Sequence, residues 1–434
     1  ISLIEAVGSG PADETVVVSE LFLRPGQTIA RGDVVAALEA AKSVFELTSP
    51  VSGSITEICV KEGDTVPVGA PLAKVRTTSA GQRQRPLVQQ QPGRPVLRRL
   101  ESRETLHLPR CETKRRAFDV GISTIATVTG SRVVSNLELA GRAQGMTPDD
   151  ILRRTGIEQR HWVNQDETAV SMAVQSCWQV LDQEHLIVDD LDLVICSTTS
   201  PLSVTPSMAC QVLNGLTGGK SDTMLQAYDI NAACSGYLYA LQAGYDYLQS
   251  RPDGRVLIVT AEVLSPLLDL DDFDTAILFS DATSASILYG ETHFDKSQAR
   301  LLRPELSAKG EDGSSLSVPF RHGGFIHMKG GKVFTEAVRR MVASLNRVCE
   351  REHLTVKDLD LVVPHQANQR IIDAIAHRIG INVYSNIRHH GNTSSSSIPL
   401  CLADVLPTVA AGDRLGLCAF GGGFTFGASI LEAN

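Results

Sequence analysis

Short apolar runs alternate with polar turns over residues 1–75. Runs such as TVVVSELFL, VVAALEA and SGSITEICV have the length of strands, and turn signals such as RPGQ and KEGD separate them. The segments VSELFLRPGQTIARGDVVAALEA and ITEICVKEGDTVPVGAPLAKV share one order of strand, Gly-containing turn and strand. This pattern predicts a small all-β sandwich or flattened barrel built from an internal repeat.

Residues 76–116 have no sustained periodicity and are rich in Gln, Arg, Pro and Ser. We therefore expect a flexible linker, with a short helix near residues 97–104. A coil of ~40 residues has a root-mean-square reach of roughly 35 Å, which is enough for a mobile arm.

From residue 117 onward, strand-like apolar runs alternate with helical patterns. The first series has the strands LDLVICSTT, MLQAYDINAA, RVLIVTAEV and SASILYG and the helices TAVSMAVQSCWQVLD, MACQVLNGL and SGYLYALQAGYDYLQS. The second has the helices VFTEAVRRMVASLNRVCER and QRIIDAIAHRIG and the strands LDLVVPH, RLGLCAF and GASILEA. Such alternation indicates a layered α/β fold, and two series predict a duplicated α/β/α unit over residues 117–434.

The charge is unevenly distributed along the chain. Residues 76–116 hold eleven Lys/Arg against three Glu, a local charge of +8, so the rest of a chain with net charge −9 carries −17. An acidic protein is a poor nucleic-acid binder, and a basic tether is more often a solvated linker than a binding site. We expect no nucleic-acid partner.

Membrane, secretion and metal signals are lacking in the sequence. It has no run of 18 uncharged apolar residues and no basic start followed by an apolar run, so we expect a cytoplasmic protein without a membrane span. The nine cysteines lack C-x-x-C spacing, so we expect no metal site and mostly buried, reduced thiols. The first residue is Ile, which leaves room for further domains upstream.

One cysteine stands where a nucleophile is expected. In DINAACSGYLYALQAG a predicted strand ends at Ala233, Cys234 follows, and a helix begins at once with Ser235 and Gly236. A helix N-terminus favours the thiolate, and small neighbours leave the sulfur accessible. A buried structural cysteine at a strand end would look similar, so this segment alone leaves both readings open.

Three further segments supply groups for thioester chemistry. His365 in LVVPHQANQRIIDAIA follows an apolar strand and precedes a helix, and Asn392 lies in the loop HHGNTSSSSIPLCL. The glycines of FGGGFTFGAS, residues 421–423, let backbone N–H groups point at one place, as an oxyanion hole requires. Together with Cys234 they predict a Cys/His/Asn site for thioester chemistry.

The motifs AACSGYLYAL, PHQANQRI, GNTSSSSIPL and GGGFTFGAS resemble the active-site signatures of β-ketoacyl-acyl-carrier-protein synthase III, a thiolase-fold family. The resemblance covers residues 117–434 and implies a homodimer. It also implies that Cys234 is acylated, that His365 and Asn392 support the thioester oxygen, and that the N–H groups of Cys234 and Gly422 form the oxyanion hole.

The sequence departs from this family at three places. Members that are primed by acyl-CoA resemble one another in a Trp and an Arg that clasp adenine, and these places hold Asp150 and Phe273 here. Without the stacking ring, CoA should be held poorly. Thr205 stands where the family often presents a Phe to the partner's acyl pocket, so acyl selectivity cannot be assumed.

The helix after the HQAN motif keeps a basic face. Arg370, His377 and Arg378 lie on it. The resemblance implies an acyl carrier protein as partner, and these cations would dock its acidic surface.

The front domain has its own resemblance, to the lipoyl and biotinyl carrier domains of enzymes such as 2-oxo-acid dehydrogenase acyltransferases. Those domains display a Lys at a hairpin tip, and Lys42 in LEAAKSVFELTSP occupies that place. Lipoyl domains usually have Asp-Lys-Ala and biotinyl domains Met-Lys-Met, whereas Ala41 and Ser43 flank the Lys here. The run VFELTSP favours a lipoyl group on Lys42; an unmodified docking domain and a biotinyl domain are the alternatives.

Together these interpretations predict an acyltransferase. We expect a thiamine-diphosphate-dependent partner to load a small acyl group onto the arm at Lys42, and Cys234 to pass it to an acyl carrier protein in specialised polyketide or peptide biosynthesis. Decarboxylative Claisen condensation by a β-ketoacyl-carrier-protein synthase III is the alternative. A non-catalytic assembly module is a third reading, which the retained Cys, His and Asn disfavour.

Overall fold

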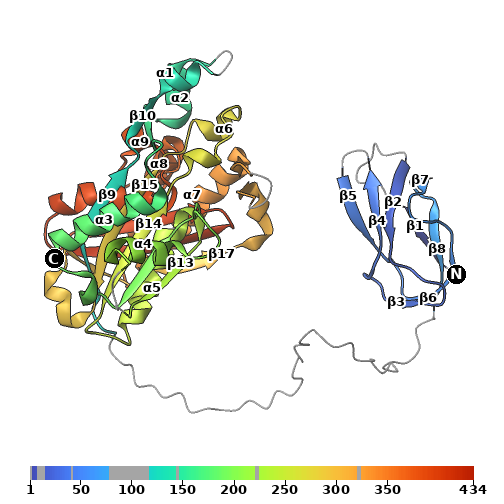
Figure 1. Ribbon diagram of the computed structural model, residues 1–434, viewed down its shortest axis with the longest axis horizontal. Helices are drawn as coiled ribbons and strands as arrows, with labels where there is room; N and C mark the ends of the chain where they lie inside the picture. Colours follow the sequence, from blue (N-terminus) through green and yellow to red (C-terminus); the bar gives the residue numbers. More distant parts are fainter. Residues whose placement is uncertain are drawn as a thin grey trace, which may run out of the picture. The chain divides into compact units, whose positions relative to one another are not determined.

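The computed structural model describes residues 2–6, 15–40, 43–77, 117–142, 146–219, 224–319 and 324–434 (Figure 1). The chain divides into two compact units, 1–109 and 110–434. The predicted linker, residues 76–116, lies outside the described residues apart from Arg76 and Thr77, and so does its expected helix. Among the described helices, none combines the length and the apolar character that a membrane span requires.

The N-terminal unit consists of two four-stranded sheets, in the orders β1-β8-β6-β3 and β5-β4-β2-β7. The strands are β1 (Ser2–Glu5), β2 (Thr15–Leu21), β3 (Thr28–Ile29), β4 (Val34–Ala40), β5 (Ser43–Thr48), β6 (Gly53–Ile58), β7 (Thr65–Pro67) and β8 (Pro71–Arg76). Buried aliphatic side chains from both sheets, among them Ile4, Val18 and Leu72, form its core. The predicted flattened all-β domain is confirmed.

The two halves of this unit repeat each other in their turns. Gly26 and Gly63 have φ of 81° and 90°, and each follows a strand at the corresponding place of its half. Only a glycine adopts this left-handed conformation without strain, which is why the P-G and E-G pairs stand there.

Strands β4 and β5 form an antiparallel hairpin in which Ala40 pairs with Ser43. Lys42 follows β4 in the sequence and lies outside the described residues. The ladder thus runs up to the segment in which the sequence predicts the attachment lysine.

The C-terminal unit is built on strands in the order β13-β12-β14-β15-β9-β16-β22-β21-β20, with β17 beside β22. They are β9 (Gly121–Thr129), β12 (Leu193–Ser197), β13 (Gln226–Ile230), β14 (Arg255–Glu262), β15 (Ala282–Tyr289), β16 (Ala299–Leu301), β17 (Glu305–Ala308), β20 (Leu361–Pro364), β21 (Arg414–Gly421) and β22 (Thr425–Ala433). Parallel β12 and β14 are followed by antiparallel β15, and parallel β20 and β21 by antiparallel β22. The predicted duplication is therefore visible in the strand directions.

Helices lie outside and between the two halves of this sheet. The longer ones are α3 (Ala169–Gln183), α4 (Met208–Thr217), α5 (Gly236–Leu248), α7 (Gly330–Arg351), α8 (Gln369–Ile379) and α10 (Ser397–Val405). Buried residues of α5 and α10 share one core with strands of both halves, whereas α3 and α4 pack on the first half and α7 and α8 on the second (Figure 1). This layered α/β arrangement confirms the predicted fold class.

The smaller elements of the C-terminal unit share a core of their own. They are the strands β10 (Arg132–Ser135), β11 (Gln159–Trp162), β18 (Leu316–Ser317) and β19 (His327–Met328) and the helices α1 (Asn136–Ala140), α2 (Pro148–Thr155), α6 (Phe273–Ala276) and α9 (Ile387–His390). Apolar side chains from them, among them Val134, Ile151 and Trp162, pack together in a separate cluster.

Candidate active site

Cys234 lies in a single 3₁₀ turn, Ala233–Ser235, between β13 and α5. The strand ends at Ile230, three residues earlier than the sequence predicts, and α5 begins at Gly236. The backbone needs glycine nearby, because a Cβ on Gly421 would stand 2.7 Å from the backbone N of Cys234. The turn therefore fixes the nucleophile against the glycine loop that follows β21.

The thiol of Cys234 is less accessible than the sequence predicts. The residue is 8% exposed, and burial raises the pKa of its thiol to about 12, while a hydrogen bond from Ser394 at 3.6 Å opposes that rise. Withdrawal from water disfavours the thiolate by more than the helix terminus and the hydroxyl favour it. Formation of the nucleophile therefore needs a proton acceptor.

His365 follows the last residue of β20 and is 1% exposed. Its Nδ1 lies 2.6 Å from the hydroxyl oxygen of Ser397. Burial lowers the pKa of His365 to about 3, so the ring is neutral at pH 7. A neutral imidazole in this position can hydrogen-bond a thioester oxygen but is a weak base.

Asn392 is positioned by hydrogen bonds of its backbone and its side chain. Its backbone N–H donates to the carbonyl of Leu278, and its side-chain Oδ1 accepts the N–H of Ser394 at 2.9 Å. The residue is 5% exposed. Fixed amide donors of this kind stabilise a developing oxyanion without adding charge.

Two cavities meet at the nucleophile. The larger, about 600 Å³, is lined by Cys234, His365 and Asn392 together, and its wall includes Arg154 and Arg370. The smaller, about 210 Å³, is also lined by Cys234 and contains Gly422. The structure thus brings all four predicted site residues to one place, with space on both sides of the sulfur.

Three of the four consecutive serines at residues 394–397 connect the parts of the site. Ser394 contacts Cys234, and Ser397 contacts His365. Between them, the Ser395 hydroxyl donates to the Glu262 carboxylate at 2.6 Å. Sequence reasoning missed Glu262, although an isolated Glu at the end of the apolar strand RVLIVT is a signal that could have identified it.

The predicted docking cations lie on α8. Arg370, His377 and Arg378 are exposed, and only the first also lines the larger cavity. The guanidinium of Arg370 lies 5.9 Å from the ring centre of Phe334. Asp373, on the same helix, is exposed as well, so the basic surface is interrupted by a carboxylate.

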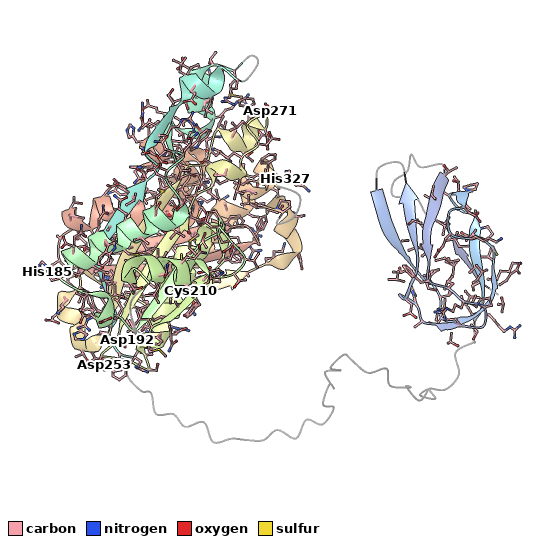
Figure 2. All side chains as sticks on the ribbon, in the orientation of Figure 1. His185, Asp192, Cys210, Asp253, Asp271 and His327 are labelled. Carbon is pink, nitrogen blue, oxygen red and sulfur yellow. The ribbon has the colours of Figure 1, made fainter. Side chains whose placement is uncertain are left out.

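The two positions at which CoA-primed members clasp adenine lie in α2 and α6. Asp150 closes a capping box with Thr147 at the start of α2, and these hydrogen bonds lower its pKa to about 2. Phe273 begins α6, and it is its neighbour Asp274 that lines the larger cavity. Asp271, just before α6, and His327 of β19 are found on the same side of the unit (Figure 2).

Thr205 lies in the loop between β12 and α4 and is exposed. It is not among the described residues that line either of the two cavities at Cys234. The effect of this departure on the acyl pocket stays a prediction. No group of three or more possible metal ligands is found in the described ranges.

Comparisons with known proteins bear on both units. Residues 228–310 match the family model of 3-oxoacyl-[acyl-carrier-protein] synthase III and residues 349–433 match the model of its C-terminal part. Residues 6–75 match the biotin/lipoyl family model, described as biotin-requiring enzyme.

Similar proteins cover the C-terminal unit almost completely. The β-ketoacyl-[acyl-carrier-protein] synthase III of Desulfotalea psychrophila is 33% identical over 333 residues, which are 72% of this chain and 100% of that protein. The crystal structure of the 3-oxoacyl-[acyl-carrier-protein] synthase III of Aquifex aeolicus is 33% identical with a TM-score of 0.67, and the match covers 72% of this chain and 99% of that one. The priming β-ketosynthase of the R1128 polyketide biosynthetic pathway is 27% identical with a TM-score of 0.65, over 73% of this chain and 96% of that one.

Proposed function

This chain belongs to the 3-oxoacyl-[acyl-carrier-protein] synthase III family and carries a biotin/lipoyl attachment domain in front; we propose that it moves a small acyl group from an arm on Lys42, through a thioester on Cys234, to an acyl carrier protein. The observation that carries this proposal is the position of Cys234 between two cavities, beside His365 and Asn392. A cysteine so placed can accept an acyl group from one thiol and give it to another.

The hairpin of β4 and β5 fits an attachment site. Its ladder ends with Ala40 opposite Ser43, so Lys42 falls in the connection between the two strands. Lys42 would hold the group; a lipoyl group supplies thiols that carry acyl groups as thioesters, whereas a biotinyl group carries carboxyl groups. Cys234 needs an acyl donor, and this need favours a lipoyl group on Lys42 over a biotinyl group.

The larger cavity supports a donor other than CoA. Asp274 stands in its wall, and Asp150 is engaged in the α2 cap, where a stacking ring would be needed to hold adenine. We propose that Arg154 and Arg370, in the same wall, receive the phosphate of the carrier protein's pantetheine arm.

Condensation is the second candidate, because Cys234, His365 and Asn392 line one cavity as a decarboxylating site would require. An assay with the full-length, arm-loaded protein separates the two functions. With the unloaded carrier protein, transfer gives the acylated carrier protein and the free thiol of the arm. With the malonyl form of the carrier protein, condensation gives a 3-oxoacyl product and CO₂. Transfer is overturned if the acyl group moves only in the presence of malonyl carrier protein.

We also propose that the protein is a homodimer that pairs through β13 at the edge of the sheet. Strand β13 has no neighbour on one side among the described strands, and Tyr228 on it and Met224 before it are exposed, as is Val204 in the loop between β12 and α4. Sedimentation at micromolar concentration should give a dimer, and Tyr228→Lys should shift it toward monomer. Trp178→Lys, on the outer helix α3, should leave the dimer intact. A fully active monomer would remove the inference.

A further inference from the structure

A carboxylate lies buried beside the nucleophile and has no part in the acyl transfer described above. Glu262 is the last residue of β14 and is 0% exposed. Its Oε2 accepts hydrogen bonds from the N–H and the hydroxyl of Thr199 at 3.1 and 2.7 Å, and its Oε1 accepts one from the Ser395 hydroxyl. Burying a carboxylate costs free energy unless it is well partnered, so its presence beside the nucleophile needs an explanation.

Ser394 joins this carboxylate to the nucleophile. Its Oγ lies 3.1 Å from Oε1 of Glu262 and 3.6 Å from Sγ of Cys234. A hydroxyl has one proton and two lone pairs, so when Ser394 turns its proton from the sulfur of Cys234 to the carboxylate, its oxygen can accept the thiol proton. The three side chains therefore form a continuous chain of thiol, hydroxyl and carboxylate.

The position of Ser394 is determined by the backbone. It has a left-handed φ of 51°, which a non-glycine residue adopts at a free-energy cost, and its N–H donates to Asn392. This conformation directs the hydroxyl to the sulfur and the carboxylate at once. The contact of Ser394 with both Cys234 and Glu262 therefore requires a strained backbone at Ser394.

His365 is a poor alternative base for the same proton. Its Nδ1 is engaged with Ser397, and burial lowers its pKa to about 3. The titratable groups that feel the charge of Glu262 are the thiols of Cys196, at β12, and Cys234. Burial raises the pKa of Glu262 itself, so its protonated form is within reach.

We propose that Ser394 and Glu262 form the proton path for acylation of Cys234. As Sγ bonds to the acyl carbon, the thiol proton passes to Oγ of Ser394 and the hydroxyl proton passes to Glu262. When the bond between the acyl carbon and the donor sulfur breaks, the electron pair leaves with that sulfur, and the proton returns along the same path to give a free thiol. The inference rests on Cys234 as the nucleophile, but not on which thiol donates.

Acylation of Cys234 by the acetyl thioester of N-acetylcysteamine tests this path in the full-length protein, and alkylation of the same sulfur by iodoacetamide is measured beside it. Alkylation needs only the thiolate, whereas acylation also needs a proton for the departing thiol. Loss of a general acid–base group lowers a rate by about 10²-fold or more, so Glu262→Gln should lower the acylation rate at pH 7 by about 10²-fold. Its alkylation rate should not fall, because removal of the negative charge favours the thiolate.

Two further variants complete the test. Ser394→Ala, a smaller change, removes the bridge and should lower the acylation rate by a similar factor. Ser396→Ala is the matched control, because its hydroxyl bonds Thr260 and the carbonyl of Ala282, and its acylation rate should stay that of the wild type. Thermal unfolding checks that each variant is folded.

The opposite result is well defined. If Glu262 were only a fixed negative charge, Glu262→Gln would speed alkylation and acylation together, which would overturn the proposal. Acylation of Cys234 that depends on Glu262, but with no transfer of the acyl group to an acyl carrier protein, would count against the proposed function and not against the proton path.

Discussion

Cys234→Ala should abolish the acyl-enzyme and reduce acyl transfer by about 10⁴-fold or more. Cys234 alone among the described cysteines lines the larger cavity together with His365 and Asn392, and Ser394 contacts its sulfur. A reaction that splits one acyl transfer into two steps stops when the carrying atom is removed. Incubation with an acyl thioester followed by peptide mapping measures the loss.

Cys210→Ala is the control for this experiment. Cys210 is exposed on the outer helix α4 (Figure 2), so a general loss of reactive thiol is separated from loss of the nucleophile. The control should acylate at the wild-type rate. Stable acylation of the Cys234→Ala protein at another residue would show that the nucleophile is assigned wrongly.

The fold was predictable because its buried elements have one-sided or wholly apolar sequences. Strand β12 is LVICS with every residue buried, and α7 repeats its apolar positions with helical period. Strand β9, GISTIATVT, was not predicted, because Ser and Thr interrupt its apolar pattern. Its place in the middle of the sheet comes from pairing with β15 and β16, which are distant in sequence.

The identity of the site residues was predictable, but their environment was not. The motif around Cys234 shows a helix start, whereas its burial depends on Ser394 and Gly421, which come from segments more than a hundred residues away. The raised pKa of the thiol is a consequence of that packing. Periodicity along one segment carries no information about it.

The roles of Glu262 and Asp150 could not be predicted from the sequence either. Glu262 looks like a single polar interruption in an apolar strand, yet it accepts hydrogen bonds from two separate loops. Asp150 was interpreted only as a lost aromatic position, yet it caps α2 together with Thr147. In both cases the role of a carboxylate follows from its hydrogen-bond donors, which the fold supplies.

Lys42→Ala should abolish loading of Cys234 by a thiamine-diphosphate-dependent partner and leave the slow reaction with free acyl-CoA unchanged. A tether of ~40 residues gives an arm at Lys42 an effective concentration in the millimolar range, which a free thioester rarely matches. Acyl-CoA, in contrast, finds Asp274 in the cavity wall. Position 150 holds Asp instead of an aromatic ring on which its adenine could stack, so the KM for acyl-CoA should be high. Acyl-enzyme is measured by intact mass after each donor is supplied.

Two lysine variants make this result specific. Lys42→Arg keeps the charge but offers no amine for attachment, so it should fail like the Ala variant. Lys74→Ala removes a partly exposed lysine of the same unit, one that pairs with Glu57, and should load normally. If the Lys42→Ala protein also loads normally and acyl-CoA saturates at low micromolar concentration, the arm is not the donor. Cys234 would then be primed by CoA, and condensation would become the better account of the cavity it shares with His365.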